Sequence, residues 1–397
     1  MHPASDIRGI KSKKLSKKRI ILGITGSISA VESIKLSREL IRHDAEVIPV
    51  MTEAATKIIH PYSLEFATSN RPITTLTGQT EHVKYCGLTK DPVDLLLICP
   101  CTANTISKIA HGIDDTAVTT FATTAIGSKI PIIIVPAMHL SMYNHKIIQE
   151  NISKCQKIGI TFIQPNIIGT KAKLQSYEEI VEHVLRKIGK NDLSKKKILV
   201  IGGATSEEID DARIITNKSS GKTAIAIVKN AFERGAEIEL WYGNVVEKIP
   251  TYIKSTKFES VNDLIKLVKK NTLSYDAIIV CAAISDYYPK KIDGKISSTK
   301  KQLNIKLTTT PKVIDLITSK AKNSKIIGFK VEKNIKQSIT EAKKLLDKND
   351  LEAVIANDIS AFGNKENEIH IIRKNDKNIA KKGEKTVLAE YILDLIK

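Results

Sequence analysis

The chain has 397 residues, 42% of them hydrophobic, and a formal net charge of +19 at pH 7. Its length predicts two or three domains, and its apolar content excludes a wholly disordered chain. Residues 1–20 hold seven basic residues against one acid, and the remaining positive charge is interleaved with acids. Because only 5% of the residues are aromatic, a stacking surface for nucleic acid is not indicated, and we expect no nucleic-acid partner.

The cysteines and the hydropathy indicate a cytoplasmic chain. Five cysteines, an odd number without repeated spacing, predict packed or reactive thiols in a reducing compartment. No apolar run approaches the roughly 20 residues that cross a bilayer. The basic stretch up to Arg19 and the apolar Ile20–Gly26 imitate a signal peptide, but Gly and Ser interrupt the apolar part. We expect a cytoplasmic protein without a membrane partner.

Residues 19 to about 187 alternate short apolar runs with segments of helical periodicity. The runs are Ile20–Ile24, Glu46–Met51, Val93–Cys99, Ile130–Val135 and Ile160–Ile163. Runs of this kind predict strands that are buried on both faces of a parallel sheet. Between the first two runs, Val31, Ile34, Leu40 and Ile41 recur at helical spacing.

A second alternating series follows Lys195. Its predicted strands are Ile198–Ile201, Ala236–Trp241, Ala277–Ala282, Ile326–Phe329 and Ala353–Ala356. Its predicted helices are Lys222–Arg234, Val261–Lys270, Pro311–Lys322 and Ile335–Lys348. Glu368–Arg373 adds an expected edge strand, and Lys385–Lys397 a closing helix.

Strands that alternate with helices predict an α/β fold class, here with two doubly wound, Rossmann-like domains. The polar run from Gly189 to Lys197 lacks periodicity and is typical of a linker. We therefore expect one domain at residues 19–190, a second at 191–397, and a basic flexible tail at 1–18.

Polar segments follow the predicted strands of the first half. Thr25–Ser29 stands between a strand and a helix, where free backbone N–H groups bind phosphate; a helix cap that serves only the fold is the alternative. The segment is not a complete G-x-G-x-x-G fingerprint. Cys99–Thr105 and Pro136–Tyr143 follow the third and fourth strands, at the edge where open α/β sheets bind ligands. His82 lies in a loop-like stretch.

These motifs resemble a known family. G-S-I-S-A, M-T-E-A-A-T-K, P-C-T-A-N-T-I-S-K-I-A-H-G and P-A-M-H-x-x-M-Y follow the first four strands and resemble the FMN-dependent cysteine decarboxylases, which include phosphopantothenoylcysteine decarboxylase. The resemblance implies a flavodoxin-like flavoprotein domain with FMN as cofactor. It implies FMN contacts by Gly26, Ser27, Ile28, Thr52, Thr102, Ala103, Asn104, Thr105 and Ala137, and a substrate contact by Met142.

The chemistry of that family needs a flavin. Loss of CO₂ from a cysteinyl carboxylate requires an electron sink, which oxidation of the thiol to a thioaldehyde-like group provides. The resemblance makes His82 the catalytic base or proton carrier. His139, also assigned to catalysis, stands where the family has Asn. The family's substrate clamp corresponds to Ile168–Leu174, which lacks the family's proton-donating Cys; Lys171 and Lys173 either bind the substrate phosphate or lie in a solvated loop.

The second half carries another candidate anion site. Asn217–Lys222 contains Ser-Ser-Gly-Lys at the start of a predicted helix. The P-loop spacing G-x-x-x-x-G-K-[ST] is not satisfied, so a Walker-type kinase is disfavoured. Lys344 and Lys348 are four residues apart and share one face of a predicted helix, although solvated surface lysines are the alternative.

An ordered set of motifs extends over roughly 160 residues of this half. G-G-A-T-x(7)-R-x-x-x-N-x-S-S-G-K, A-A-x-S-D-Y, G-K-I-x-S, T-P-K-V-I, G-F-K-x-E and A-N-D resemble phosphopantothenate–cysteine ligase. In that family a nucleotide, usually CTP, activates the carboxylate of 4′-phosphopantothenate as an acyl-nucleotide, and the cysteine amine displaces the nucleotide. The resemblance implies catalytic roles for Asn217 and Lys295 and a Mg²⁺ contact by Asp286.

The same resemblance implies a set of substrate and nucleotide contacts. These are Ser219, Ser220, Gly221, Lys222, Val280, Cys281, Ala282, Asp286, Lys295, Pro311, Lys312, Val313, Ile314, Phe329, Lys344 and Lys348. Mg²⁺ and lysines would offset the repulsion between a carboxylate and a triphosphate.

Both halves, in this order, resemble the bifunctional coenzyme A biosynthesis proteins. The resemblance implies FMN and Mg²⁺ as cofactors, 4′-phosphopantothenate, L-cysteine and CTP (or ATP) as ligands, and a homo-oligomer built on trimers, up to a dodecamer. Two alternatives remain: a ligase whose flavin domain is not catalytic, and a regulatory flavoprotein.

Overall fold

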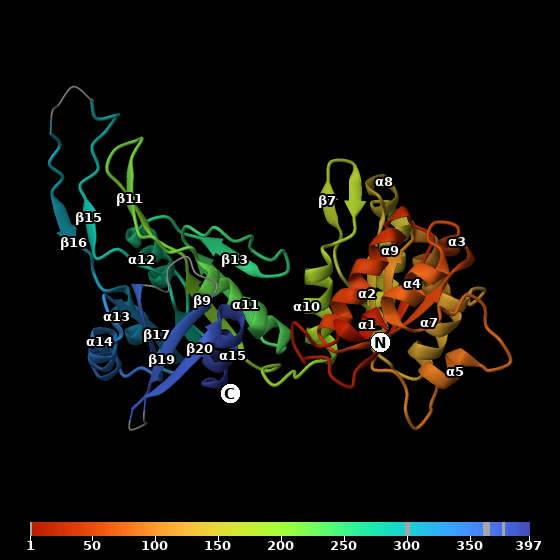
Figure 1. The fold of residues 1–397 in the computed structure, drawn as a ribbon. Helices are drawn as coiled ribbons and strands as arrows, with labels where there is room; N and C mark the ends of the chain where they lie inside the picture. Colours follow the sequence, from red (N-terminus) through yellow and green to blue (C-terminus); the bar gives the residue numbers. More distant parts are fainter. Residues whose placement is uncertain (1, 298–301, 360–365, 375–377) are drawn as a thin grey trace. The chain divides into compact units, whose positions relative to one another are not determined.

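The computed structural model describes residues 2–297, 302–359, 366–374 and 378–397. The chain divides into two compact units, 1–190 and 191–397, each built around its own main sheet (Figure 1). The division falls in the polar segment that the sequence indicates as a linker. Among the described residues, no helix combines the length and the apolar character needed to cross a bilayer.

The N-terminal unit has a five-stranded parallel sheet in the order β2–β1–β3–β4–β6. Its strands are β1 (Arg19–Ile24), β2 (Glu46–Met51), β3 (Leu95–Cys101), β4 (Ile132–Pro136) and β6 (Thr161–Phe162). Side chains alternate between two cores: Ile20, Leu22 and Ile24 lie in one, and Ile21 in the other. The order is that of flavodoxin-like folds, which confirms the predicted class.

Helices cover both faces of this sheet. One core contains side chains of α2 (Ser33–Arg42), α4 (Pro61–Thr68) and α10 (Tyr177–Ile188). The other contains side chains of α6 (Ala103–His111), α7 (Ala117–Gly127) and α9 (Lys146–Lys157). Shorter elements are η1 (Ile28–Glu32), α3 (Glu53–Thr56), α5 (Glu81–Cys86) and α8 (Leu140–Tyr143).

The prediction of a flexible tail at residues 1–18 is wrong. Residues 2–18 include α1 (Pro3–Asp6), and the Leu15 side chain is fully buried in the core beside α2. The amides of Gly9 and Lys11 donate to Ile41 O and Arg42 O, each at 3.0 Å, so the segment caps carbonyls at the end of α2. The basic composition suggested disorder, but Ala4 and Leu15 provide an apolar anchor.

The C-terminal unit has an eight-stranded sheet in the order β13–β12–β9–β14–β17–β18–β19–β20. Six strands are parallel, in the Rossmann order: β9 (Lys197–Gly202), β12 (Glu237–Tyr242), β13 (Lys254–Lys257), β14 (Ala277–Val280), β17 (Lys325–Glu332) and β18 (Ala353–Asp358). β19 (Glu366–Ile372) and β20 (Ile379–Glu384) are antiparallel. The expected edge strand is therefore flanked on both sides, because β20 pairs beyond it.

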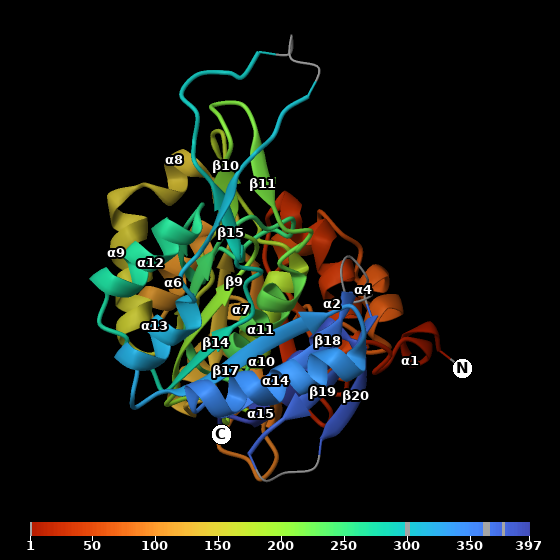
Figure 2. The same ribbon diagram turned by 90° about the vertical axis from the view of Figure 1, so that its left-hand side faces the viewer.

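Helices again cover both faces. α11 (Lys222–Glu233) and α15 (Lys385–Asp394) pack in one core with alternate residues of β9, such as Ile198 and Val200. α12 (Val261–Lys270), α13 (Val313–Lys320) and α14 (Ile335–Asn349) pack in the other with Leu199 and Ile201. Figure 2 shows α14 along β17 and β18.

Two small hairpin-like sheets extend from this unit. β10 (Ser206–Glu208) pairs with β11 (Ile214–Thr216), and β15 (Tyr287–Pro289) pairs with β16 (Leu307–Thr309). The described residues between β15 and β16 form an arm that Figure 1 shows projecting from the unit. The sequence did not predict these strands, because each has only three residues.

Candidate functional sites

Both main sheets contain a topological switch point. The strand order reverses between β1 and β3 in the N-terminal unit and between β9 and β14 in the C-terminal unit. Open α/β sheets bind ligands beyond the carboxyl ends of the strands at such a point. The sequence places its polar motifs at these same strand ends.

Thr25 ties the ends of β1 and β3 together. Its hydroxyl donates to Pro100 O at 2.9 Å and accepts from the amide of Thr102 at 3.0 Å. Its own amide donates to Pro100 O at 3.2 Å, and the Ala137 amide, after β4, donates to Cys101 O at 3.0 Å. Three strand ends therefore form one fixed rim.

Gly26 lies where no side chain fits. A Cβ at this position would stand 2.5 Å from the Cβ of Ala54, at the start of α3. Ser27 is the N-cap of η1 and accepts a hydrogen bond from Ser29 N, while Ile28 is largely exposed. The turn after β1 therefore runs close against the segment after β2 and leaves an apolar side chain at the surface.

The threonines of the rim cap the next helices. Thr52 accepts from the Ala55 amide at 3.2 Å, and Thr102 accepts from the Thr105 amide at 3.3 Å. Ala103, Thr105 and Ala137 are buried, whereas Asn104 is exposed. All nine predicted FMN contacts thus lie along the carboxyl ends of β1, β2, β3 and β4.

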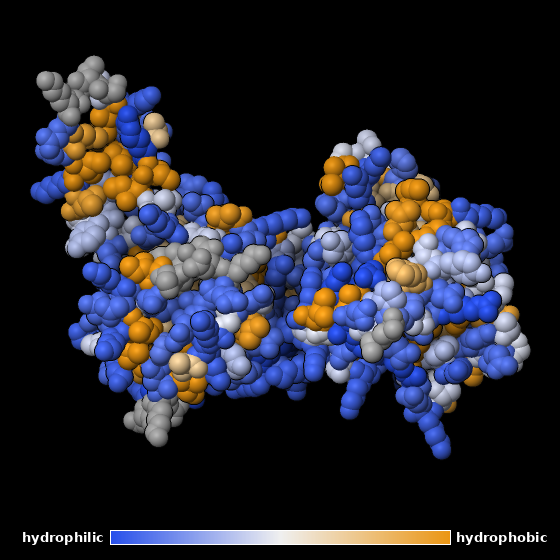
Figure 3. Space-filling model, viewed as in Figure 1, coloured by the Kyte–Doolittle hydropathy of each residue, from blue (hydrophilic) through white to orange (hydrophobic). Residues whose placement is uncertain are grey.

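A three-stranded flap follows β4. β5 (Met138–His139) pairs with β8 (Lys171–Lys173), which pairs with β7 (Asn166–Ile168). In this register His139 stands opposite Lys171, and both are exposed. Ile167, Ile168 and Met142 are also exposed, and Figure 3 shows apolar side chains at the tip of the flap.

The cysteines of this unit do not belong to the flap. Cys86, Cys99, Cys101 and Cys155 are all buried and free. Burial raises the pKa of the Cys86 thiol to about 12 and that of Cys155 to about 11. None of these thiols is an exposed, acidic group.

His82 is not part of the rim within one chain. It lies on α5, which packs against α7, and Figure 1 shows α5 apart from α3 and α8. Its Nδ1 atom is buried and has no hydrogen-bond partner in the described structure.

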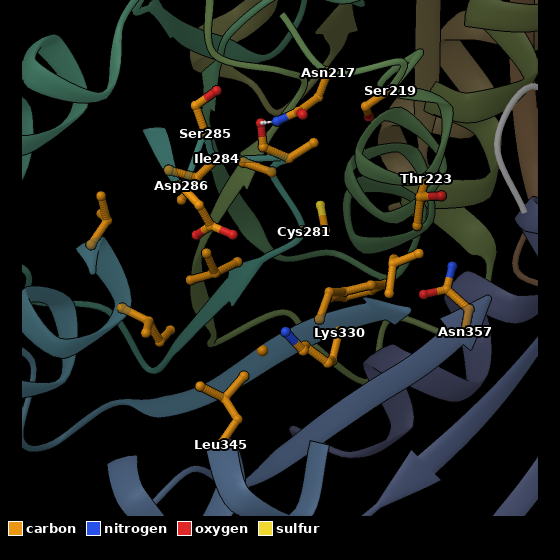
Figure 4. A pocket seen from close by; sticks show the side chains of 18 of the residues that line it. Asn217, Ser219, Thr223, Cys281, Ile284, Ser285, Asp286, Lys330, Leu345 and Asn357 are labelled. Carbon is orange, nitrogen blue, oxygen red and sulfur yellow. Dashed lines mark hydrogen bonds between the residues drawn. The ribbon is translucent and has the colours of Figure 1, made fainter. Parts of the chain in front are cut away.

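The C-terminal unit contains a pocket of about 710 Å³ at its switch point. Every contact residue predicted for this unit lines it except Lys295. Figure 4 shows polar side chains of Asn217, Ser285 and Asp286 directed toward the same space, with Lys330 below them.

Glycines allow the close approach of the pocket walls. A Cβ on Gly202, at the end of β9, would stand 2.2 Å from Ala224 Cβ on α11. Gly221, the N-cap of α11, has φ +73°, and a Cβ there would lie 2.4 Å from Val245 Cγ1. No side chain caps α11, and its first residues Lys222, Thr223 and Ala224 line the pocket.

The polar wall is held by backbone and side-chain bonds. Asn217 Nδ2 donates to Ala283 O at 3.0 Å, and the Thr205 hydroxyl accepts from the Ser285 amide at 2.9 Å. Thr310 Oγ1 donates to Ser285 O at 2.6 Å. Asn217 is thereby fixed beside the segment that follows β14.

The lysines that approach from α13 and α14 are paired with acids. Lys312 Nζ lies 2.5 Å from Asp286 Oδ1, and Lys348 Nζ lies 2.7 Å from Asp315 Oδ2. Lys344 pairs with Glu341 at 2.6 Å. Among the described residues, no group of three or more His, Cys, Asp or Glu could hold a metal ion.

Two family models cover nearly the whole chain. Residues 8–189 match the Flavoprotein model, and residues 193–397 match the model of the DNA/pantothenate metabolism flavoprotein C-terminal domain. The coenzyme A biosynthesis bifunctional protein CoaBC of Thermococcus kodakarensis is 44% identical over 402 residues, which cover 100% of this chain and 99% of that protein. The chain belongs to the CoaBC family.

A second curated relative agrees with this membership, and the chain is also similar to solved structures. The CoaBC protein of Methanocaldococcus jannaschii is 39% identical over 404 residues, covering 100% of this chain and 98% of that protein. Among solved structures, the DNA/pantothenate metabolism flavoprotein of Streptococcus pneumoniae is 28% identical with a TM-score of 0.46, covering 51% of this chain and 98% of that one. The family that the sequence predicts is confirmed, and with it the bifunctional role in coenzyme A biosynthesis.

The rim of the N-terminal unit fits the flavin of a CoaBC protein. Gly26 leaves a backbone surface that a side chain would fill, which is what a phosphate-binding turn requires. The rim hydroxyls, the exposed amide of Asn104 and the apolar Ile28 offer both polar and stacking contacts. These are residues that would hold FMN.

Lys295 departs from the predicted CoaBC site. It is exposed on the arm between β15 and β16, where Gly294 N donates to Asp211 Oδ2 at 3.0 Å and Ile296 N donates to Asp210 Oδ2 at 3.0 Å. These bonds join the arm to the β10–β11 hairpin. The Ile296 amide and neighbouring donors lower the pKa of Asp210 to about 2.

Several pocket residues were not found by sequence reasoning. Thr223, Lys330, Asn357 and Lys385 line the same space as the predicted residues. Asn357 belongs to the A-N-D motif, which was a signal without an assigned role. Lys385 carried no signal, because single lysines are frequent in this chain.

Proposed function

We propose that the chain ligates 4′-phosphopantothenate with L-cysteine in its C-terminal unit and decarboxylates 4′-phosphopantothenoylcysteine to 4′-phosphopantetheine in its N-terminal unit. The observation that carries the proposal is the pocket at the switch point of the C-terminal unit, which is lined by every predicted contact of that unit apart from Lys295. The predicted residues that line this pocket come from separate segments of the chain, which supports the assignment of one ligase site to it.

In the ligase reaction, CTP is the proposed nucleotide, with ATP as the alternative. Lys312, Lys344 and Lys348 would exchange their carboxylate partners for phosphate oxygens, which offsets the repulsion between a carboxylate and a triphosphate. Asn217, held by Ala283 O, keeps a second amide hydrogen for the acyl oxygen and carries no charge that would repel it. The nucleotide phosphates and Asp286 would share a Mg²⁺ ion.

In the decarboxylase reaction, FMN would supply the oxidation of the cysteinyl thiol that turns the substrate itself into the electron sink. The rim residues Gly26, Thr102 and Asn104 orient FMN, and Met142 with the apolar flap residues covers the substrate and excludes water. His82 manages the proton at the thiol carbon. His139 binds the carboxylate through a ring N–H, in the place of the family's Asn.

The geometry supports a homo-oligomer. Since His82 lies apart from the rim of its own chain, a second copy would bring it to the flavin, which fits a trimer-based assembly. The arm of the C-terminal unit exposes Tyr287, Ile292, Leu303, Ile305 and Leu307, and Figure 3 shows this apolar surface. A second copy would bury it. The free cysteines suit a cytoplasmic location.

One incubation tests both activities. The full chain, loaded with FMN, is mixed with phosphopantothenate, cysteine, Mg²⁺ and CTP or ATP, and pyrophosphate, CO₂ and product mass are followed. We expect pyrophosphate and CO₂ in equal amounts. Pyrophosphate without CO₂ would leave a ligase with a non-catalytic flavin domain, which the absence of a flap cysteine favours as the second candidate. If the chain released neither pyrophosphate nor CO₂, the proposal would be contradicted.

A further inference from the structure

The stretch of the arm that carries Lys295 is fixed on both sides of that residue. Gly294 N donates to Asp211 Oδ2 at 3.0 Å, and Asp211 N donates to Gly294 O at 3.3 Å. Ile296 N donates to Asp210 Oδ2 at 3.0 Å. The backbone around Lys295 is therefore bound to the loop between β10 and β11, and Figure 2 shows this hairpin beside the arm.

Asp210 uses its two carboxylate oxygens for different segments. Oδ1 accepts from the amides of Ala212 and Arg213 at 2.8 and 2.7 Å, which shapes the loop. Oδ2 accepts from Ile296 N and from the Arg213 side chain, whose Nη1 atom also donates to Ile296 O at 3.3 Å. Because an amide side chain has only one acceptor oxygen, an asparagine could not serve both segments.

The contact with the arm is the main support of the Asp210 charge. The side chain is only 1% exposed, and a buried carboxylate is costly unless hydrogen-bond donors meet it. The Ile296 amide, ahead of the loop amides and the Arg213 side chain, lowers the pKa of Asp210 to about 2. The carboxylate therefore serves more than the turn of its own loop.

The same hairpin leads to the ligase pocket. β11 ends at Thr216, directly before Asn217, and Thr216 Oγ1 donates to Thr205 O at 2.8 Å. The Thr205 hydroxyl in turn accepts from Ser285 N, in the pocket wall, at 2.9 Å. One end of the hairpin therefore holds Asn217 at the pocket, and the loop at its other end holds Lys295 outside it.

We propose that Asp210 and Asp211 are positioning residues for Lys295, which they hold so that it assists formation of the acyl-nucleotide in the pocket of another copy. This inference rests on the proposed ligase function. In that step a carboxylate oxygen of phosphopantothenate bonds to the α-phosphorus, and the bond from this phosphorus to the leaving pyrophosphate oxygen breaks. Lys295 offsets the charge on the phosphoryl oxygens. Its position matters, because a displacement of about 1 Å can cost about 100-fold in rate.

The central variant is Asp210→Asn in the full chain, assayed with phosphopantothenate, cysteine, Mg²⁺ and CTP. The asparagine oxygen can still accept from the loop amides, but its NH₂ group then faces Ile296 N, and the bond to the arm is lost. We expect kcat for pyrophosphate release to fall about 10- to 100-fold, with KM values changed less than about threefold. Asp293→Asn, at an exposed position on the same stretch, is the matched control and should keep the wild-type kcat.

A double variant separates positioning from a general loss of structure. If Asp210 acts through Lys295, Asp210→Asn should cost nothing further in a chain that already carries Lys295→Met. If Asp210 were merely structural, the double variant would be slower than Lys295→Met by the whole factor that Asp210→Asn causes alone.

Hydrogen exchange of the unliganded chain tests the contacts without activity. The amides of Gly294 and Ile296 should exchange slowly in the wild type. Asp210→Asn should speed the exchange of Ile296, and Asp211→Ala that of Gly294, each by at least about tenfold. Because Asp211 is exposed, Asp211→Ala also provides a second kinetic test if Asp210→Asn does not fold, and it too should lower kcat.

Defined outcomes overturn the positioning role. Wild-type kcat in Asp210→Asn would do so, as would an additive loss in the double variant or unchanged exchange of both amides. Wild-type kcat in Lys295→Met would refute this inference and leave the ligase proposal standing. If the wild-type chain releases no pyrophosphate, the ligase proposal itself fails, and this inference fails with it even where the exchange data confirm the contacts.

Discussion

Asn217 combines neutrality with a fixed position. Its amide donates to Ala283 O, beside the segment that carries Asp286, and its side chain faces the pocket. A carboxylate there would lose this bond, since two acceptors would face each other, and would repel both anionic substrates. We therefore expect the neutral polar side chain to serve twice, in holding the pocket wall and in the proposed ligase reaction.

We predict that Asn217→Asp lowers the ligase rate by about 100-fold or more, the range seen when one oxyanion donor is removed. Pyrophosphate release measures the effect. CO₂ release from added phosphopantothenoylcysteine should be unchanged, because that reaction belongs to the other unit. The exposed Asn262→Asp on α12 is the control. Ligase activity within twofold of the wild type in Asn217→Asp would contradict the assignment.

The substitution Gly26→Ala tests the flavin rim, because it adds a single methyl group to the turn after β1. Because the added Cβ would stand 2.5 Å from Ala54 Cβ, Gly26→Ala should displace the turn after β1 and abolish binding of FMN. The protein should then purify colourless, and flavin titration should show at least a tenfold weaker affinity. Gly127→Ala is the matched control, because nothing lies within 4 Å of its Cβ position.

A compensating change sharpens this prediction. Ala54→Gly removes the atom that a side chain at position 26 would meet, so the double variant Gly26→Ala/Ala54→Gly should regain the yellow colour. A double variant that stays colourless, or a single variant that keeps its flavin, would show that the turn is not the phosphate-binding element.

At the residue scale, residues within a local sequence motif could be predicted, whereas isolated residues could not. Gly26 and Gly221 could be read from the sequence because a glycine before a helix has few other purposes. Lys385 could not, since its place in the lining of the pocket depends on α15 lying beside α11, a contact between segments more than 150 residues apart. Lys295 shows the opposite case: its motif is present, but its own chain holds it away from the pocket.

The N-terminal segment and α2 form one element at the next scale. Ser12 Oγ lies 2.7 Å from His43 Nδ1, at the end of α2, and Lys11 pairs with the buried Glu39. Burial, assisted by the charges of Lys11 and Lys14, lowers the pKa of His43 to about 4 in spite of the opposing charge of Glu39. The imidazole is thus neutral in the folded unit over a range in which the unfolded chain would protonate it.

This shift predicts a pH dependence. Between the ordinary pKa of 6.5 and about 4, the unfolded chain binds a proton at His43 that the folded chain does not. The contribution of neutral His43 to the free energy of unfolding is therefore complete above pH 6.5. It is lost as the pH falls toward 4, by about 3 kcal/mol in total at 1.36 kcal/mol per pKa unit. Urea unfolding of the N-terminal unit, followed by flavin fluorescence across this range, measures the slope.

The control separates His43 from general acid effects. His43→Gln should reduce the slope between pH 6.5 and 4.5 and leave the part due to His183, whose pKa burial also lowers to about 4. His111→Gln, at an exposed position on α6, should leave the slope unchanged. Equal slopes in the wild type and in His43→Gln would contradict the burial of a neutral imidazole beneath the N-terminal segment.

Among the elements, length and apolar content decided what the sequence could predict. β1, β3, β9 and β14 are continuous apolar runs, and their order follows from two doubly wound domains. β13, with the sequence Lys-Ser-Thr-Lys, and the three-residue strands of the arm carry no such pattern. The N-terminal segment was misread because its lysines outnumber the two apolar residues that anchor it.

At the scale of the whole molecule, each of the two sites lacks one of its predicted residues. Each unit forms most of a site by itself, yet His82 and Lys295 lie away from the rim and the pocket that their motifs serve. Assembly of identical chains would complete both sites with residues that one chain leaves outside.

The arm of the C-terminal unit allows the assembly of identical chains to be tested. Leu307 and Ile305 are exposed at 43% and 38% beside other apolar residues of the arm, a surface that monomeric proteins rarely present. Leu307→Lys should place a charge in the interface between copies and reduce the mass of the assembly, measured by light scattering after gel filtration. Ligase activity should fall with the mass, while FMN content stays unchanged.

Ile379→Lys, on the outer strand β20 and similarly exposed, is the control and should leave the mass unchanged. A Leu307→Lys variant with the wild-type mass would show that the arm does not join copies of the chain; a smaller assembly with full ligase activity would show that each pocket works without a partner's Lys295.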